Sequence, residues 1–291
     1  MKTEIITSND QDIKELVRAK YGDIAKTEPS ATGTTSSTCC AKTSCSGPPP
    51  TPKACCGNGV SNLMADDYKD VSGYNPDADL GLGCGLPTQF AQIQPGDTVI
   101  DLGSGAGNDC FVARSETGPN GKVIGVDFTP SMIERARRNV ERRGYDNVEF
   151  VEGDIEHVPL PDGIANVIVS NCVLNLVPNK AAVYREILRL LRPGGHFSVS
   201  DIVIVGNLPE EVRSGAELYA GCVAGAMSMD GYLGLIPEAG FVNIKLQKKK
   251  LIQVPDEIYL KVLTPKQLEE FKASGTGIFS ISVYAEKPVT D

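Results

Sequence analysis

Apolar positions in the central part of the chain form short continuous runs, separated by longer stretches with helical periodicity. Short apolar runs predict buried strands, and apolar residues spaced three and four apart predict helices. Five strand-like runs occur, at residues 98–103, 122–128, 148–154, 165–172 and 196–203. Helical patterns follow three of them, from about 108, at 130–144 and at 180–195. This alternation predicts right-handed crossovers and a doubly wound α/β fold with a parallel sheet.

The first 70 residues follow two other patterns. Residues 10–21 have apolar residues at helical spacing with an Asp or Asn cap, which predicts an N-terminal helix within residues 1–26. Residues 27–70 are rich in Ser, Thr, Gly, Pro and Cys and poor in apolar side chains, which predicts a flexible segment. Five of the nine cysteines lie there: Cys39, Cys40, Cys45, Cys55 and Cys56.

The strand–helix alternation relaxes after residue 205. Two stretches with helical spacing precede two β-like runs, at 208–228, 230–241, 242–254 and 277–285. We therefore expect an α/β core at residues 71–205. Residues 206–291 are expected to form a C-terminal extension that binds substrate and supplies the last part of the sheet.

Composition narrows the cellular setting and the partners. Hydrophobic residues make up 41% of the 291 residues, no apolar run approaches the length of a membrane span, and the start has no signal-peptide pattern. We expect a cytoplasmic monomer that does not bind membranes. The net charge of −9 disfavours nucleic acid as a partner, because an acidic chain repels phosphate backbones.

The cysteine content is high beside only two histidines. Nine is an odd number and no secretory signal is visible, so a disulfide framework is disfavoured and reduced thiols are expected. No Cys-x-x-Cys pairing typical of a zinc finger or ribbon occurs near the cysteines outside residues 27–70. The high cysteine content therefore requires an explanation other than a structural zinc site.

A glycine-rich turn follows the first strand. Gly103, Gly105 and Gly107 would let the backbone approach a ligand closely. Asp127 ends the second strand, 20 residues after Gly107, where such folds hold ribose hydroxyls. A tight strand-to-helix turn without a ligand is the simpler alternative, but acids at three successive strand ends argue for a nucleotide site.

The type of nucleotide follows from the neighbouring residues. Asp154 and Ile155 follow the third strand, where an adenine would lie. The sixth position of the dinucleotide motif holds Asn108 instead of glycine, and the acid Asp101 precedes the loop. An acid there is unfavourable beside pyrophosphate but suits the ammonium of a methionine moiety. S-adenosylmethionine is therefore favoured over NAD or a nucleoside triphosphate.

The tip of the fourth strand carries Asn171 and Cys172. In an S-adenosylmethionine fold this tip faces the methyl group, so Asn171 is a candidate cofactor residue and Cys172 a candidate substrate ligand. Thiolates select soft, thiophilic centres. Three thiolates around a trivalent metalloid would leave its lone pair free to attack the methyl group, without a general base at that step.

Three other cysteines lie in the folded part of the sequence. Cys84 and Cys222 lie in segments expected to fold over the ligand-bearing edge of the sheet. Taken alone, each is as well explained as a small buried hydrophobe. Cys110, within the first core helix, is interpreted as such a hydrophobe.

Six segments together resemble the arsenite S-adenosylmethionine methyltransferases, over about residues 74–240. They are GYNPDADLGLGCG, VIDLGSGAGNDCFVA, VIGVDFTPSMIERAR, SNCVLNLVPNK, LRPGGHFSVSDIV and LYAGCVAGA. The resemblance implies a Rossmann-like methyltransferase that methylates arsenite in arsenic detoxification, using S-adenosylmethionine.

The same resemblance implies roles for individual cysteines. Trivalent arsenic would be held by Cys84, Cys172 and Cys222, the last in the extension at 206–291. An upstream cysteine would join redox cycling with thioredoxin or glutathione as reductant, and Cys55 or Cys56 matches that position. This chain departs from the pattern by carrying five cysteines in its N-terminal segment, which leaves the choice between them open.

Two other functions remain open at this stage. One is a methyltransferase of a small organic molecule, whose core cysteines have no chemical role. The other is a non-enzymatic metalloid-binding protein that uses the Cys-rich segment. Thiol-dependent binding of arsenite would distinguish arsenite methylation from the first alternative. Turnover of the cofactor would distinguish it from the second.

Overall fold

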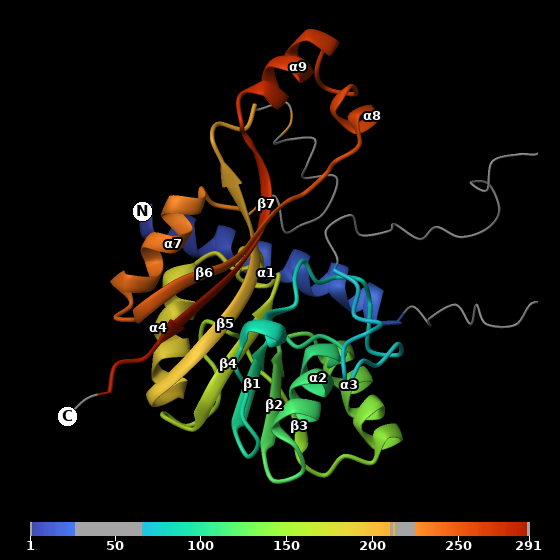
Figure 1. Ribbon diagram of the computed structural model, residues 1–291, viewed down its shortest axis with the longest axis vertical. Coiled ribbons are helices and arrows are strands. Elements are labelled where there is room, and N and C mark those ends of the chain that lie inside the picture. Colours follow the sequence, from blue (N-terminus) through green and yellow to red (C-terminus); the bar gives the residue numbers. More distant parts are fainter. Residues whose placement is uncertain (1, 27–65, 210–211, 213–224, 290–291) are drawn as a thin grey trace, which may run out of the picture.

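The computed structural model describes residues 2–26, 66–209, 212 and 225–289 (Figure 1). Their strands form one seven-stranded sheet with the order β3-β2-β1-β4-β5-β7-β6. The strands are β1 (Thr98–Leu102), β2 (Lys122–Asp127), β3 (Val148–Glu152), β4 (Ala165–Asn171), β5 (Leu191–Val205), β6 (Val242–Leu251) and β7 (Gly277–Glu286). The expected doubly wound α/β fold is confirmed.

Helices cover both faces of this sheet (Figure 1). The helices of the described residues are α1 (Lys2–Lys26), α2 (Asn108–Thr117), α3 (Pro130–Arg143), α4 (Lys180–Leu190), α7 (Met229–Glu238), α8 (Asp256–Tyr259), α9 (Pro265–Ala273) and the short 3₁₀ helices η1 (Pro87–Phe90) and η2 (Leu174–Leu176). Apolar residues of α2 and α3 pack with Val99 and Val123 on one face. Those of α4 and α7 pack with Ile100 and Ile124 on the other. Successive strand residues point to opposite faces, so both sides of the central strands are apolar.

The strand directions differ from a purely parallel sheet at one edge. β1 to β5 pair in parallel, but β7 is antiparallel to β5, and β6 is antiparallel to β7. β5 also begins five residues earlier than its apolar run predicts, because Leu191 already pairs with Ala165 of β4. α4 therefore ends at Leu190 and does not continue to residue 195.

The C-terminal part of the chain contributes to the same sheet. The helix expected at 208–228 lies mostly outside the described residues, whereas α7 occupies the second expected stretch. Two short helices that the sequence patterns did not indicate, α8 and α9, lie between β6 and β7, beyond the end of the sheet (Figure 1). Within the described part of the chain, no helix is long and apolar enough to cross a membrane.

Candidate active site

A pocket of about 1050 Å³, including its open mouth, lies at the carboxyl ends of β1, β2 and β4. Its walls come from the loop after β1, the residues that follow β2 and β3, the tip of β4, and α1. β1 and β4 are neighbours in the sheet, but the strands that follow them in the chain lie on opposite sides: β2 lies beside β1, and β5 lies beside β4. Open α/β sheets bind ligands at such a switch point, which makes this pocket the candidate active site.

The three glycines of the loop after β1 have different structural roles. Gly105 lines the pocket with φ of +52°, and a Cβ there would meet no atom within 4 Å, so its backbone conformation alone favours glycine. Gly103 also lines the pocket with a positive φ. Gly107 is not among the lining residues. It caps α2, and a Cβ would lie 2.6 Å from Phe150 Cζ, so it permits close packing of the helix on the sheet.

Asp127 holds this loop from the end of β2. Its carboxylate accepts hydrogen bonds from the backbone N–H of Gly105 at 3.0 Å and of Thr129 at 2.8 Å. Burial raises the pKa of Asp127, although these donors oppose the effect. The remaining acceptor capacity of the carboxylate faces the pocket, where it could accept hydroxyl groups of a ligand.

Two further buried acids line the pocket next to the loop. Asp101, which is 2% exposed, accepts a bond from the Cys110 thiol at 3.3 Å. Asp109 accepts a bond from Tyr68 Oη at 2.8 Å. Burial raises the pKa of Asp101 well above its usual value and that of Asp109 to about 6, and the charge of Asp109 adds to the effect on Asp101. Uncompensated buried carboxylates are costly, so a cationic ligand is favoured here and a pyrophosphate is not.

These features fit S-adenosylmethionine. Its sulfonium and ammonium groups would offset the charges of Asp101 and Asp109, and its ribose could use Asp127. Ser104 Oγ is buried in the pocket wall without a hydrogen-bond partner among the described residues, which leaves one polar group for a ligand. All but Gly107 of the cofactor residues expected from the sequence line the pocket, namely Asp101, Gly103, Gly105, Asp127, Asp154, Ile155 and Asn171.

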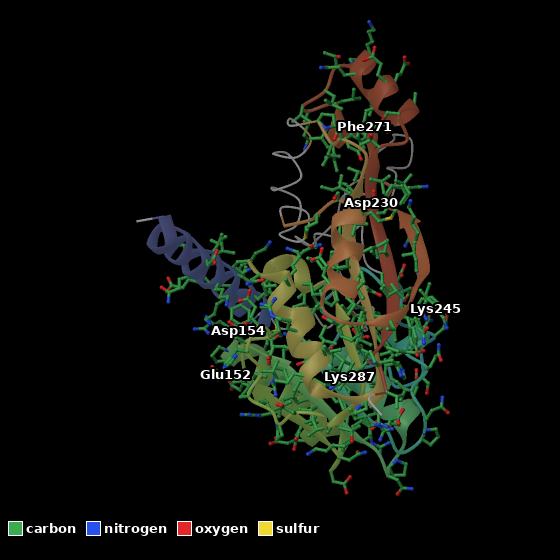
Figure 2. The ribbon with its side chains drawn as sticks, turned by 90° about the vertical axis from the view of Figure 1, so that its left-hand side faces the viewer. Glu152, Asp154, Asp230, Lys245, Phe271 and Lys287 are labelled. Atoms are coloured by element: carbon green, nitrogen blue, oxygen red, sulfur yellow. The ribbon has the colours of Figure 1, made fainter. Side chains whose placement is uncertain are left out.

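One wall of the pocket belongs to α1, which the sequence patterns did not connect with the cofactor. Lys14, Val17 and Tyr21 of this helix line the pocket. Lys14 Nζ forms ion pairs with Asp154, at 2.6 Å, and with Glu156 (Figure 2 shows Asp154 beside α1). A helical pattern predicts an element but not its packing partner, so only the side-chain contacts reveal this wall.

Asn171, at the end of β4, ties the cofactor pocket to the segment that carries Cys84. Its Oδ1 accepts the backbone N–H of Cys84 at 3.0 Å, and its Nδ2 donates to the Gly85 carbonyl at 2.8 Å and to Tyr68 Oη at 2.7 Å. A Cβ at Gly83 would lie 2.7 Å from Asn171 Nδ2. The glycine before Cys84 is therefore required for this close approach.

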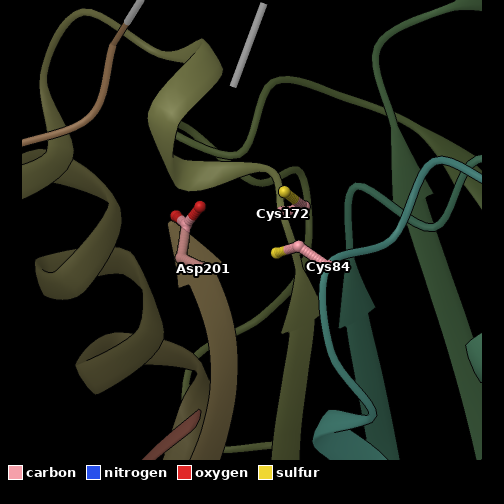
Figure 3. Close-up of side chains that lie close together, drawn as sticks. All are labelled: Cys84, Cys172 and Asp201. Carbon is pink, nitrogen blue, oxygen red and sulfur yellow. The ribbon is translucent and has the colours of Figure 1, made fainter. Parts of the chain in front are cut away.

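Cys172 and Cys84 lie together at the tip of β4. Cys172 lines the pocket and has a left-handed backbone conformation with φ of +61°. The two Sγ atoms and a carboxylate oxygen of Asp201 all lie within 4.8 Å of one another (Figure 3). All three side chains are buried. The sequence patterns did not single out Asp201, because an acid inside an apolar strand gives no indication of the face it occupies.

Three of the predicted cysteines lie outside the described residues: Cys55, Cys56 and Cys222. Cys110 is buried within α2, beside Asp101. The described part of the chain therefore brings together two of the three expected arsenic ligands, and the third stays a prediction.

Residues 93–257 match the family model described as a methyltransferase domain. An arsenite methyltransferase from Halobacterium salinarum is 41% identical over 254 residues, which are 85% of this chain and 62% of that protein. A human arsenite methyltransferase is 35% identical over 193 residues, or 62% of this chain and 50% of that protein. The chain thus spans less than two thirds of the length of these curated relatives.

Among solved structures, CrArsM, an arsenic(III) S-adenosylmethionine methyltransferase from Chlamydomonas reinhardtii, superposes with a TM-score of 0.60. It is 31% identical, and the match covers 79% of this chain and 73% of that one. The YcgJ protein from Bacillus subtilis, at 21% identity and a TM-score of 0.57, shares the fold. This chain therefore belongs to the methyltransferase-domain family and, within it, to the arsenic(III) S-adenosylmethionine methyltransferases.

Proposed function

We propose that this protein methylates trivalent arsenic with S-adenosylmethionine as methyl donor, and that it takes part in arsenic detoxification. The observation that carries the proposal is the thiol pair at the tip of β4, where Cys172 lines the cofactor pocket and its Sγ lies within 4.8 Å of Cys84 Sγ. Paired thiolates select a soft centre such as arsenic over a hard organic nucleophile. The names of the relatives support the same substrate.

Three thiolates are proposed as the arsenic ligands, from Cys84, Cys172 and Cys222. The first two enter the site from elements held rigidly. Asn171 and Ser280, whose Oγ donates to the Cys84 carbonyl at 2.6 Å, fix the Cys84 backbone, and the Cys172 N–H donates to the Ser200 carbonyl at 2.8 Å. Cys222 is assigned from the sequence alone. Replacing it by Ser tests the assignment, because a neutral hydroxyl cannot replace a thiolate on arsenic.

The chemistry needs positioning more than proton transfer. S-adenosylmethionine supplies a methyl group that its positive sulfur makes electrophilic. Arsenic held by three thiolates keeps its lone pair, which forms the As–C bond as the C–S bond of the donor breaks. The thiol protons leave when arsenic binds, so no side chain has to act as a base during the attack. The protein contributes by fixing the arsenic and the donor in one orientation.

Each methylation oxidises arsenic formally from trivalent to pentavalent, and a further round needs two electrons. Two thiolates can supply them by forming a disulfide, and exchange with thioredoxin or glutathione then restores the thiols. We propose Cys55 or Cys56 as the partner of a ligand cysteine in this step. Both lie in the Cys-rich sequence at 27–70, outside the described residues.

A product time course tests the redox role. Replacing Cys55 and Cys56 together by Ser should spare the first methylation of a trivalent arsenical bound to a small thiol. It should slow later rounds that start from arsenite, with thioredoxin or glutathione present. Replacing Cys39 and Cys40 by Ser is the matched control. Identical product ratios for the unchanged protein and the Cys55/Cys56 double variant would remove these residues from the cycle.

Product identification tests the proposed function itself. The protein is incubated with arsenite, a small thiol and S-adenosylmethionine, and arsenic species are separated and identified by mass spectrometry. Methylated arsenic is expected, with one S-adenosylhomocysteine formed for each methyl group transferred. Binding of arsenite without consumption of the donor would favour a metalloid-binding protein. Consumption that depends on an organic acceptor, and not on arsenite, would favour an organic-substrate methyltransferase.

A further inference from the structure

Asp201 is a buried acid that the proposed methyl transfer does not use. It lies on β5, is 0% exposed, and directs its carboxylate toward the space shared with Cys84 and Cys172 (Figure 3). The two thiols pack with apolar side chains that include Ile202 and Ile278. A carboxylate in such a place is costly unless it has a partner of opposite charge.

Neighbouring side chains hold this carboxylate in one orientation. Asn175 Nδ2 donates to Oδ1 at 2.8 Å, and so does the backbone N–H of Ile202 at 2.8 Å. Tyr232 Oη donates to Oδ2 at 3.2 Å. Each carboxylate oxygen has two acceptor sites, so these bonds orient the group and leave capacity on Oδ2. Fixing a potential ligand by outer hydrogen bonds is typical of metal sites.

The three ligand atoms lie close enough together to bind one ion after a small movement. They lie within 4.8 Å of one another. In a zinc site with Zn–S and Zn–O bonds of about 2.3 and 2.1 Å, the ligand atoms are roughly 3.5–3.8 Å apart. A contraction of at most about 1.3 Å, which rotation of the two cysteine side chains can supply, would bring the two sulfurs and the oxygen to that spacing.

We propose that Cys84, Cys172 and Asp201 form a binding site for a thiophilic divalent cation such as Zn²⁺ or Cd²⁺. Binding forms two metal–sulfur bonds and one metal–oxygen bond and releases the two thiol protons. These three ligands leave the fourth position of a tetrahedral site for water or a further ligand. Trivalent arsenic is a soft centre that binds thiolates, whereas a divalent cation of intermediate softness is also stabilised by a carboxylate ligand. Asp201 therefore determines that this thiol pair also accepts a divalent cation.

The charge balance of the site supports a divalent occupant. Two thiolates and one carboxylate carry three negative charges, so a divalent ion leaves a single negative charge. Lys180, at the start of α4, is 8% exposed and interacts electrostatically with Asp201. Its positive charge offsets that remainder.

Direct cation binding tests the proposal. The five cysteines at 27–70 and the proposed arsenic ligand Cys222 would also bind such ions, so the full chain with all six replaced by Ser is the reference protein. Cd²⁺ is titrated without arsenite or S-adenosylmethionine, and the cadmium–thiolate ultraviolet absorbance is recorded. Zn²⁺ affinity is measured by competition with a chromophoric chelator. The reference protein should bind one ion with the absorbance of two thiolate bonds.

Two variants and one control decide the outcome. D201N should weaken Zn²⁺ and Cd²⁺ binding at least tenfold while keeping the two-thiolate absorbance at saturating Cd²⁺. C84S should lose about half of that absorbance. C110S, which removes a buried thiol outside the cluster, should bind like the reference protein. Unchanged affinity in D201N, or unchanged absorbance in C84S, would overturn the proposal. Unfolding is excluded by S-adenosylmethionine affinity, and because arsenite is absent, failure of the proposed methylation leaves this result intact.

Discussion

Cys172 carries the proposed arsenic-binding thiol on a strained backbone. Its φ of +61° lies in the left-handed region, which costs an L-residue with a Cβ about 1–2 kcal/mol. The strain persists because β4 ends at Asn171 and η2 begins at Leu174, which fixes the turn on both sides. Strained residues of this kind concentrate at functional sites, where the surrounding structure over-determines them.

A pair of substitutions measures this strain without the thiol. Cys172→Gly is expected to be more stable than Cys172→Ala by about 1 kcal/mol, because glycine adopts the left-handed region freely. At Cys110, inside α2, the order should reverse, with alanine favoured by about 1 kcal/mol. Urea unfolding of the four proteins provides the comparison. An alanine preference at both positions would mean that the turn at Cys172 relaxes readily.

Asp127 is the residue most directly tied to the cofactor. Asp127→Asn should weaken S-adenosylmethionine binding by about tenfold or more, because hydrogen bonds to a charged acceptor are worth roughly 1.5–3 kcal/mol. Calorimetric titration measures the affinity. Glu149→Gln, an exposed acid on β3, serves as the control with no expected change. Equal affinity for both variants and the unchanged protein would exclude Asp127 from ribose binding.

At the scale of elements, α1 illustrates what periodicity can and cannot indicate. The helix itself was predictable from its spacing, although it begins at Lys2 and the expected cap, Asn9 or Asp10, lies inside it. Its position over the cofactor pocket was not predictable. That position depends on long-range contacts, such as the Lys14 pair with Asp154 and the stacking of the Arg18 guanidinium on the Phe128 ring at 5.3 Å. In contrast, the loop after β1 and Asp127 follow each other at a fixed spacing along the chain, so the sequence indicated them directly.

The attachment of α1 makes a prediction for Lys14. Lys14→Met should reduce S-adenosylmethionine affinity roughly two- to fivefold, because partly exposed ion pairs contribute about 0.2–1 kcal/mol. Amide exchange in α1 should quicken as well. Lys20→Met, an exposed position on the same helix, should change neither quantity. Affinity and exchange that respond alike to both substitutions would argue against a specific role for the Lys14 contact.

At the scale of the whole molecule, the five parallel strands were predictable because each is a compact apolar run, and helical patterns follow three of them. The antiparallel place of β7 between β5 and β6 was not, since pairing of distant strands leaves no local pattern. α8 was also missed, because one turn of helix is too short to develop periodicity. Cys84 and Cys172 are 88 residues apart in the sequence, so their proximity also depends on long-range contacts that leave no local pattern.

Buried acids make the stability of the molecule depend on pH. The pKa of Asp109 is raised to about 6 by burial, so the folded state binds more protons than the unfolded state between about pH 4 and 6. Its contribution to stability is therefore lost as pH rises through that window. The relevant quantity is the free energy of unfolding of the unchanged protein minus that of Asp109→Asn. This difference should fall by about 1–3 kcal/mol as the pH rises from about 4 to 6 and stay constant above pH 7. Parallel curves for the two proteins in urea titrations would contradict this.

Transfer of a labelled methyl group to arsenic in one turnover tests whether the thiols at the tip of β4 hold arsenic for methylation. Protein is mixed with equimolar arsenite and S-adenosylmethionine labelled in the methyl group, and the label on arsenic is measured after acid quenching. We expect label on arsenic with the unchanged protein and with Cys110→Ser. Cys172→Ser should transfer none while keeping its affinity for S-adenosylmethionine, because the arsenic ligand at the tip of β4 is gone. Transfer by Cys172→Ser at the rate of the unchanged protein would contradict the account.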